Sequence, residues 1–347
     1  MRLRKITIIF LFIFVVVSFY YLSGEAGQKR QKTEAVAEEE VYIPQEIKTI
    51  MEQGVAARQP RLDIPFEIVR FLYVPAQQNV HAVFLFKIKN ADLVFELPLI
   101  ETEEKKAELE VQTEVSQIIQ TNFKIFAQFF ENKNGTVGQM VRESYVPASF
   151  QEESSAHQPE KDNVYSLGYP LPPGDYLMAL AVTSPDLSKV GLQLLEFSLP
   201  DFLSFQDKLG LTPVFFIESF EQHEKPEIIT KVHKNSFVYS TLEIVPKVKN
   251  IFSPNELVDI FYFVYGCKPK TGTNQYDIAI KYRVLKGEEP VMLYKESVFP
   301  FPLISHPLPF LKKDDQPPEP GSYILEINIT DNVSGHSLDQ NIAFEIK

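Results

Sequence analysis

Hydrophobic and polar residues largely alternate along the chain from residue 62 onward. The segments LDIPFEIVRFLYVP and VHAVFLFKIKNADLVFEL show this pattern and stop at Pro or Asn, and it returns in SFVYSTLEIVP, LVDIFYFVYGC, QYDIAIKYRVL and VMLYKESVFPF. A period of two is the spacing of side chains along a β-strand, and β-branched and aromatic residues favour strands. The pattern therefore predicts an all-β fold.

Several segments between these strands carry their own signals. TNFKIFAQFFENKNGTVGQMV predicts a hairpin that turns at Asn134 and Gly135, because Asn-Gly suits the tightest hairpin turns. Residues 101–120 are ambiguous, since their charges favour a helix while Thr and Val favour a strand, and we prefer an edge hairpin. Residues 149–161 read as a polar loop. The prolines within residues 300–309 predict a crossing loop or an edge strand, because proline cannot donate to a sheet ladder.

One phrase occurs twice, at an offset of 147 residues. PPGDYLMALAVTSPDL begins at Pro172 and EPGSYILEINITDNVS begins at Glu319. In both copies Pro-Gly predicts a type II turn, and a strand led by tyrosine follows. The inward positions of these strands and of the returning strands correspond one to one: Tyr176, Met178, Leu180, Val182, Leu195, Phe197 and Leu199 against Tyr323, Leu325, Ile327, Ile329, Ile342, Phe344 and Ile346. The offset is far longer than the roughly 20–50 residues of a solenoid repeat.

The repeat therefore predicts two tandem immunoglobulin-like β-sandwiches that end alike, each tyrosine anchoring its hairpin as in a tyrosine corner. The outer faces of the two hairpins differ. They carry Leu177, Ala179 and Ala181 in the first copy and Ile324, Glu326 and Asn328 in the second. We expect the first outer face to be covered by the linker or the other domain, and the second to be wet.

The N-terminal segment predicts export. Basic residues precede Ile6–Leu22, an apolar run of 17 residues in which only Thr7 and Ser18 are clearly polar. The run is longer than a usual signal core of roughly 7–15 residues and reaches the lower end of a membrane span, roughly 17–25. A cleaved signal peptide and a retained membrane anchor both fit, which places the protein in the periplasm or at the cell surface.

The predicted organisation has five parts. They are a signal peptide or membrane anchor (1–26), a polar spacer with a short helix (27–61), a first β-sandwich (62–202), a connector (203–235) and a second β-sandwich (236–347). The helix is indicated by Ile47, Ile50 and Met51 after Pro44, and Gly54 and then Pro60 should end it. The connector is apolar around residues 214–217, so we expect it to strap against one domain.

Composition and charge narrow the function. Net charge is −12 with a sequence pI near 5.1, which argues against a nucleic-acid partner. Hydrophobic residues make up 44% of the chain, enough for a sizeable core. The single cysteine, Cys267, cannot form an internal disulfide and is best explained as a packing residue. No Trp is present, which weakens the case for a sugar-stacking platform.

No constellation of residues nominates a catalytic, cofactor-binding or metal site, and we expect no cofactor. The six histidines form no H-x-H pair, and His223 and His233 lie ten apart where the helical zinc motif needs four. GCKPKTG lacks phosphate-loop spacing and reads as a hairpin loop. The remaining candidates are best explained as solvated loops (Glu152, Glu153, Asp314, Asp315), turn formers (Asp331, Asn332) and sequons (Asn134, Asn328, Asn332).

The Pro-Gly-x-Tyr hairpins, the export signal and the strand FSPNELVDIFYFVYG resemble the exported bacterial proteins associated with the GWxTD domain. That resemblance implies β-sandwich modules without catalytic residues, although the Gly-Trp-x-Thr-Asp motif itself is absent. The Pro-Gly-x-Tyr phrase is also similar to fibronectin type III and carboxypeptidase-regulatory-like sandwiches.

Together these features predict a non-catalytic interaction or structural module of the bacterial envelope with a protein partner. Such a module should expose apolar side chains at the domain junction or on an edge strand. A carbohydrate- or small-ligand-binding module is the alternative and should show an open groove with coplanar Tyr or Phe rings. A hydrolase, which is less favoured, should bury a carboxylate or histidine of shifted pKa in a cleft.

Overall fold

Strands make up most of the structure. The computed structural model describes residues 42–76, 79–97, 117–205, 208–227, 230–254, 256–309 and 317–347. Within these ranges lie strands β1 to β22, one α-helix and three short 3₁₀ helices (Asn90–Asp92, Ser154–Ala156 and Phe202–Ser204). The strands assemble into several sheets, so the predicted all-β, sandwich-type fold is confirmed.

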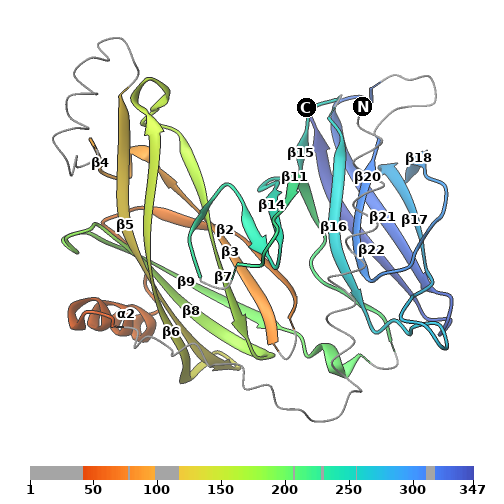
Figure 1. Cartoon of the computed structure of the whole chain (residues 1–347), viewed down its shortest axis with the longest axis horizontal. Helices are drawn as coiled ribbons and strands as arrows, with labels where there is room; N and C mark the ends of the chain where they lie inside the picture. Colours follow the sequence, from red (N-terminus) through yellow and green to blue (C-terminus); the bar gives the residue numbers. More distant parts are fainter. Residues whose placement is uncertain are drawn as a thin grey trace.

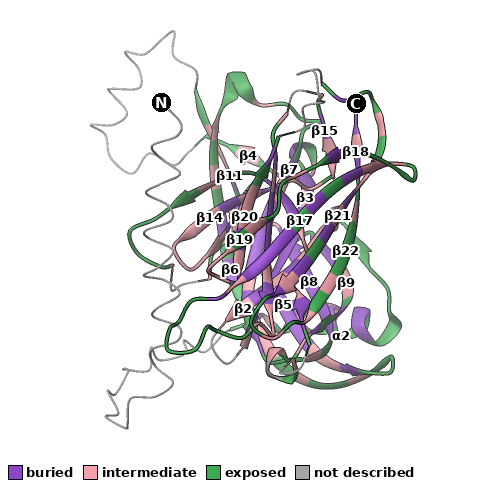
Figure 2. Cartoon of the chain, turned by 90° about the vertical axis from the view of Figure 1, so that its right-hand side faces the viewer, coloured by how far each residue is buried: buried purple, intermediate pink, exposed green. Residues whose placement is uncertain are grey.

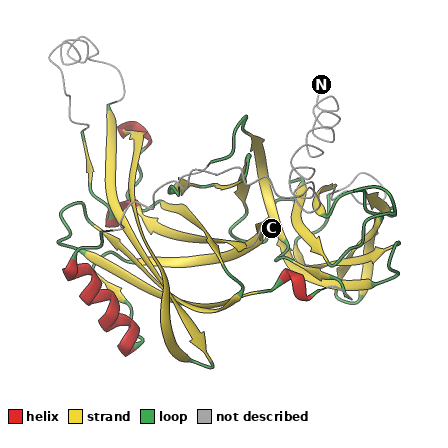
Figure 3. Ribbon diagram, turned by 60° about the horizontal axis from the view of Figure 1, so that its bottom comes forward, coloured by secondary structure: helices red, strands yellow, loops and turns green. Residues whose placement is uncertain are grey.

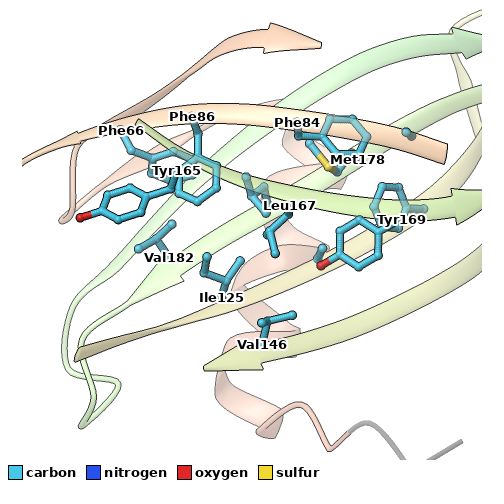
Figure 4. Packing of buried hydrophobic residues seen from close by; sticks show 14 of the residues in the cluster. Phe66, Phe84, Phe86, Ile125, Val146, Tyr165, Leu167, Tyr169, Met178 and Val182 are labelled. Carbon is cyan, nitrogen blue, oxygen red and sulfur yellow. The ribbon is translucent and has the colours of Figure 1, made fainter. Parts of the chain in front are cut away.

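Two facing sheets enclose the first core and lie on the left of Figure 1. One has the order β1-β9-β8-β5-β4 with β6 beside β5, and the other has the order β12-β7-β3-β2. Their strands are β1 (Arg61–Leu62), β2 (Phe66–Ala76), β3 (Asn79–Lys89), β4 (Phe95–Glu96), β5 (Ile118–Lys133), β6 (Thr136–Glu153), β7 (Asp162–Leu171), β8 (Gly174–Thr183), β9 (Val190–Leu199) and β12 (His233–Lys234). Figure 4 shows Phe84 and Tyr165 from one sheet packing with Ile125 and Val146 from the other.

A second core lies between two further sheets, on the right of Figure 1. One has the order β10-β16-β11-β14-β13 with β20 beside β16, and the other has the order β15-β22-β21-β17-β18 with β19 beside β17. Their strands are β10 (Gly210–Leu211), β11 (Phe215–Gln222), β13 (Phe237–Tyr239), β14 (Leu242–Pro246), β15 (Ile251–Phe252), β16 (Val258–Tyr265), β17 (Ile278–Lys286), β18 (Glu289–Leu293), β19 (Ser297–Phe299), β20 (Leu303–Leu308), β21 (Gly321–Asp331) and β22 (Ser337–Ile346). The two cores share no residue, and their folding as separate domains stays a prediction.

The repeated phrase forms the same hairpin in both halves, β8–β9 and β21–β22. Tyr176 pairs with Phe197 in the first, and Tyr323 pairs with Phe344 in the second, so the pairing register is conserved at the offset of 147 residues. The ring centroids in these pairs are 5.4 and 5.5 Å apart. All seven predicted inward positions of each copy are buried or pack against the core, and the predicted register is confirmed.

The Pro-Gly pairs bend the chain differently from the prediction. Gly174 and Gly321 are the first residues of β8 and β21, with φ of 156° and 145°. A type II turn needs a φ of about +80° at this position, so the predicted turn is wrong in both copies. Each tyrosine hydroxyl donates a hydrogen bond to the carbonyl four residues earlier, Tyr176 to Pro172 at 2.8 Å and Tyr323 to Glu319 at 2.5 Å. These bonds tie the chain that enters each strand to the start of the strand.

Helix α2 (Gln45–Ala57) covers the outer face of the first hairpin, as Figure 3 shows. Its buried residues Ile47, Met51 and Val55 pack in one cluster with the outward side chains of β8, Leu177, Ala179 and Ala181. The prediction that this face is covered is therefore confirmed, but the cover is the spacer helix and not the linker or the other domain as expected.

The helix continues past Gly54 to Ala57 and ends before Pro60, so of the two predicted end signals Gly54 does not act as one. A Cβ on Gly54 would lie only 2.2 Å from Cδ2 of Leu192, so the glycine allows α2 to approach β9 closely. No described helix covers the matching face of the second hairpin. Asn328 is exposed there, and Ile324 and Glu326 are half-exposed, which confirms the expected wet face. Strand β22 of this hairpin is coloured mainly as exposed and intermediate in Figure 2.

A shared apolar cluster joins the two halves. Leu72 and Leu85, on the outer face of the first half, pack in one cluster with Phe215, Ile217 and Phe261 of the second. The connector was expected to strap against one domain, but its apolar part is instead strand β11, which pairs with β14 and β16. Hydrogen bonds from Arg70 and Tyr239 reinforce this junction.

These contacts also run from the first half to the second. Arg70 donates hydrogen bonds to the carbonyl of Lys247 and to Oδ1 of Asn250. The hydroxyl of Tyr239 donates to the carbonyl of Pro75 at 2.8 Å. Apolar burial and hydrogen bonding therefore act together at the junction.

Four local predictions are wrong. The predicted polar loop 149–161 begins only at Ser154, because strand β6 continues through Glu153 and the ring of Phe150 lies 5.1 Å from that of core Tyr165 between centroids. SFVYSTLEIVP is a hairpin of two strands, since Ser240 adopts a positive φ of 57°. VMLYKESVFPF likewise divides, into β18 and β19. GCKPKTG links strands of two different sheets and is not a hairpin loop.

Two other predictions are confirmed, and some lie outside the described residues. The hairpin turn at Asn134 and Gly135 forms, and the proline-rich segment contains the edge strand β20. The apolar run Ile6–Leu22, most of residues 101–120 and Asp314-Asp315 are outside the described ranges. In the part that is described, no helix is long and apolar enough to cross a bilayer.

Candidate functional site: the free edge of strand β6

Strand β6 is a long strand at the edge of its sheet. It pairs with β5 from Thr136 to Glu153, and no other strand among the described residues pairs with it. Its 18 residues exceed the usual strand length of about 3–10. An edge of this length presents a row of unpaired backbone groups, which is a template for another strand.

The residues whose N–H groups face this free edge follow from the hydrogen-bond pattern. The amide of Ser154 bonds the carbonyl of Gln117 at 2.7 Å, continuing the β5–β6 ladder. Residues alternate along an antiparallel ladder, so even-numbered residues of the segment 142–153 bond β5 and odd-numbered ones point away. Pro147, which has no N–H, occupies an outward position as this alternation requires. The outward N–H groups therefore include those of Tyr145, Ser149 and Gln151.

The side chains of β6 fix the strand from behind. Val146 and Ala148 point into the first core. Glu143 forms an ion pair with Lys48 of α2 at 3.4 Å. On the outer face, Tyr145 is 38% exposed and stacks on Phe126 with centroids 5.2 Å apart. The edge is thus rigidly held and carries an exposed aromatic ring.

A second exposed apolar surface lies on β18 and β19, the edge of the other half. Leu293 is 75% exposed and Val298 56%. However, β18 has five residues, contains Pro290 and shifts register against β17. A short, interrupted edge is a poor template for a further strand. Edge β6 is the stronger candidate.

The histidines are not brought together. Three form separate pairs with glutamates: His157 with Glu152 at 2.7 Å, His223 with Glu243 at 2.9 Å and His233 with Glu227 at 3.0 Å. His306 stacks against Tyr282, 5.3 Å between centroids. Across the described ranges, no group of three or more His, Cys, Asp or Glu side chains is arranged to hold a metal ion.

The other residues singled out in the sequence have mostly structural surroundings. Burial raises the pKa of Cys267 to about 12, which keeps its thiol protonated at neutral pH. Asp331 accepts a hydrogen bond from the amide of Val333, as expected of a turn former. Asn332 instead reaches across to Oδ1 of Asp277 at 2.9 Å. Asn332 lies in the predicted turn, but its side chain bonds Asp277 and not the local backbone as expected.

One member of the acidic pair at the end of β6, Glu152, also differs from the expectation, whereas Glu153 is exposed. Glu152 accepts hydrogen bonds from His157 and from Lys234 of β12, so it is not in a solvated loop. Burial, the largest single effect, raises the pKa of Glu152, but the hydrogen bonds and charges of His157 and Lys234 together outweigh it and lower the pKa. Glu152 therefore ties the end of β6 to the facing sheet.

Exposed aromatic residues do not form the groove that a sugar-binding sandwich would need. Among the described residues, the exposed Phe and Tyr side chains are Tyr42 and Tyr145. Tyr145 is stacked against its own sheet. Sequence reasoning found the β5–β6 hairpin through Asn134-Gly135, but nothing local indicated that β6 would lack a second partner.

Comparisons with known proteins give little likeness. No family model and no curated protein matches the chain. Among solved structures, dimeric latent PorU from Porphyromonas gingivalis is 9% identical with a TM-score of 0.30, over 82% of this chain and 20% of that chain. The BSP domain of a biofilm-associated protein is 11% identical with a TM-score of 0.20, over 87% of this chain and 54% of that chain. Similarity at this level supports no conclusion about function.

Proposed function

We propose that this chain is an exported, non-catalytic β-sandwich protein of the cell envelope. In this proposal it is an interaction or structural module that binds a protein partner by adding the partner's strand to the free edge of β6. The observation that supports it most is the length of β6, 18 residues with one unpaired edge. The apolar run Ile6–Leu22 supports export, and it would hold the protein at the membrane if it is retained.

Strand addition suits this edge for two physical reasons. Backbone hydrogen bonds supply affinity, and side chains at alternate positions supply specificity. Because Val146 and Ala148 are fixed in the core, the edge is ordered before binding and loses little conformational entropy. Pro147 interrupts the donor row, so the partner strand should pair on one side of it, with residues 148–153 or 136–146.

A photo-crosslinking amino acid in place of exposed Gln151 tests this proposal in intact cells. We expect a covalent adduct to one partner protein, and no adduct from the same group at exposed Gln340 of β22. Ser149→Pro, which removes an outward N–H, should abolish the adduct, whereas Ser149→Ala, which keeps it, should not. Equal adducts from Ser149→Pro and Ser149→Ala would show that strand addition at β6 is not the mode of binding.

A further inference from the structure

A polar cavity of about 310 Å³ lies at the junction, and its lining includes Arg142 of β6 but none of the outward-facing positions Tyr145, Ser149 and Gln151. Its walls come from the outer face of β3 and β7 and from the β13–β14 hairpin, with Arg142 of β6 reaching in. The same wall includes Glu227, Thr230, Lys231 and His233. The volume is at the lower end of small-molecule sites, which span roughly 300–1,000 Å³. The cavity therefore suits a ligand of monosaccharide size.

Two residues shape one wall of this cavity. A Cβ on Gly168 would lie 2.5 Å from Nε2 of His81, so only glycine leaves room for the imidazole. The carbonyl of Val238 in the β13–β14 hairpin accepts a hydrogen bond from the ring, and Tyr239 lies 6.3 Å from it between centroids. Close packing on Gly168 and the neighbouring Tyr239 ring therefore position His81 in this wall.

The charged side chains that line the cavity carry a net positive charge, and Arg142 lacks an acidic partner among the described residues. Arg142 is held by the carbonyl of Pro170 at 3.2 Å, and its Cζ lies 5.6 Å from the centre of the Tyr169 ring. Among the described residues, no carboxylate forms an ion pair with Arg142. The single acidic residue of the lining, Glu227, is already shared between Lys231 at 3.8 Å and His233 at 3.0 Å.

One arginine and one lysine against one glutamate leave an excess positive charge in the lining. This excess occurs in a chain whose net charge is −12. A guanidinium has five N–H donors arranged to grip a planar anion, and the carbonyl of Pro170 occupies one of its nitrogens. The remaining donors are available to a ligand.

We propose that this cavity binds a small organic carboxylate of monosaccharide size, with Arg142 as its main counter-ion and Lys231 as a second cation. The carboxylate is favoured because its plane matches the guanidinium fork. The polar lining, which includes the hydroxyl-bearing residues Thr230 and Ser240, suits the hydroxyl groups of such a ligand.

Calorimetric titration of the purified full-length chain with D-glucuronate tests this proposal, with D-glucose and inorganic phosphate as comparison ligands. We expect glucuronate to bind, and glucose and phosphate to bind at least tenfold more weakly. Arg142→Gln should weaken glucuronate binding at least tenfold, and Arg142→Lys should weaken it less, because it keeps the charge without the fork. Lys281→Gln, which removes one positive charge from the remote strand β17, should leave binding unchanged.

The thermal midpoint of each variant should be measured in parallel, so that weakened binding is read only from folded protein. The proposal is overturned if glucuronate does not bind at about 10 mM, equivalent to a binding free energy weaker than about −3 kcal/mol. It is also overturned if phosphate or glucose binds as tightly, or if folded Arg142→Gln binds as the unmodified chain does. Crosslinking from β6 is unaffected by any of these outcomes.

Discussion

The tyrosine that leads each closing hairpin is held at both ends. Tyr176 and Tyr323 stack on the phenylalanine of the returning strand, and each hydroxyl donates to a carbonyl four residues earlier. The ring fixes the strand in the core, and the hydroxyl fixes the chain that enters it. Identical residues at an offset of 147 thus perform one structural role twice.

Removal of either hydroxyl should therefore cost about the same. Tyr176→Phe and Tyr323→Phe should each lower the free energy of unfolding by about 1 kcal/mol, the usual net contribution of one hydrogen bond. Tyr145→Phe, on the exposed face of β6, is the control and should have little effect. Urea unfolding measures all three, and unequal losses from the two hairpin tyrosines would contradict their equivalence.

His81 should make the fold sensitive to acid. Burial lowers its pKa from 6.5 to about 4, outweighing the hydrogen bond to Val238. Below pH 6.5 the unfolded chain takes up a proton that the folded chain does not, so stability present at neutral pH is lost as the pH falls towards 4.

Between pH 7.5 and 4.5 the difference between the pKa of His81 in the unfolded and the folded chain should remove about 2–3 kcal/mol from the free energy of unfolding. Urea unfolding of His81→Gln should lose less over the same range, because glutamine does not titrate. His223→Gln, which replaces an exposed histidine, serves as the matched control. An identical pH dependence in His81→Gln and the unmodified chain would show that His81 is not the acid-sensitive group.

At the scale of elements, local pattern predicted what local geometry determines. The alternation of hydrophobic and polar residues predicted the strands around Tyr176 and Tyr323. It also predicted their register, because a shift by one residue would turn every core side chain outward. It missed the β13–β14 turn, where Ser240 takes a positive φ without a glycine to signal it. It also missed β11, whose partners β14 and β16 are fixed by contacts distant in sequence.

The free edge of β6 could not be predicted for the same reason. Asn134-Gly135 specifies that β5 and β6 pair, but whether a third strand lies beyond β6 depends on the whole topology. Pro147 is compatible with an edge strand, yet it is equally common in loops. The cover on the first hairpin was signalled more clearly, by the apolar outer residues Leu177 and Ala181.

The contact between α2 and β9 gives an unusual expectation for a glycine in a helix. Gly→Ala inside a helix usually stabilises by about 0.5–1 kcal/mol. Gly54→Ala should instead destabilise by about 1–3 kcal/mol, because its Cβ would meet Leu192.

In a Leu192→Ala background the same change should be neutral or stabilising, and a double-mutant cycle in urea measures the coupling. Stabilisation by Gly54→Ala in the unmodified chain would show that α2 does not pack as closely on β9 as described.

At the scale of the whole molecule, an apolar cluster joins the two cores, and two surfaces are proposed to bind other molecules. They are the free edge of β6 and the cavity at the junction. The junction cluster around Leu85, Phe215 and Phe261 holds the halves together and places Arg142 and Lys231 around one cavity. The free edge of β6 lies on the first half alone. One surface suits a strand and the other a small anion, so the two proposals can fail separately.

Amide hydrogen exchange along β6, measured residue by residue on the isolated chain, tests the free edge most directly. The inward amides of Val146 and Ala148 bond β5 and should be strongly protected, whereas the outward amides of Tyr145, Ser149 and Gln151 should exchange at least about a hundredfold faster. Uniform protection of both sets would mean that another part of the chain already pairs with β6, and strand addition there would be contradicted.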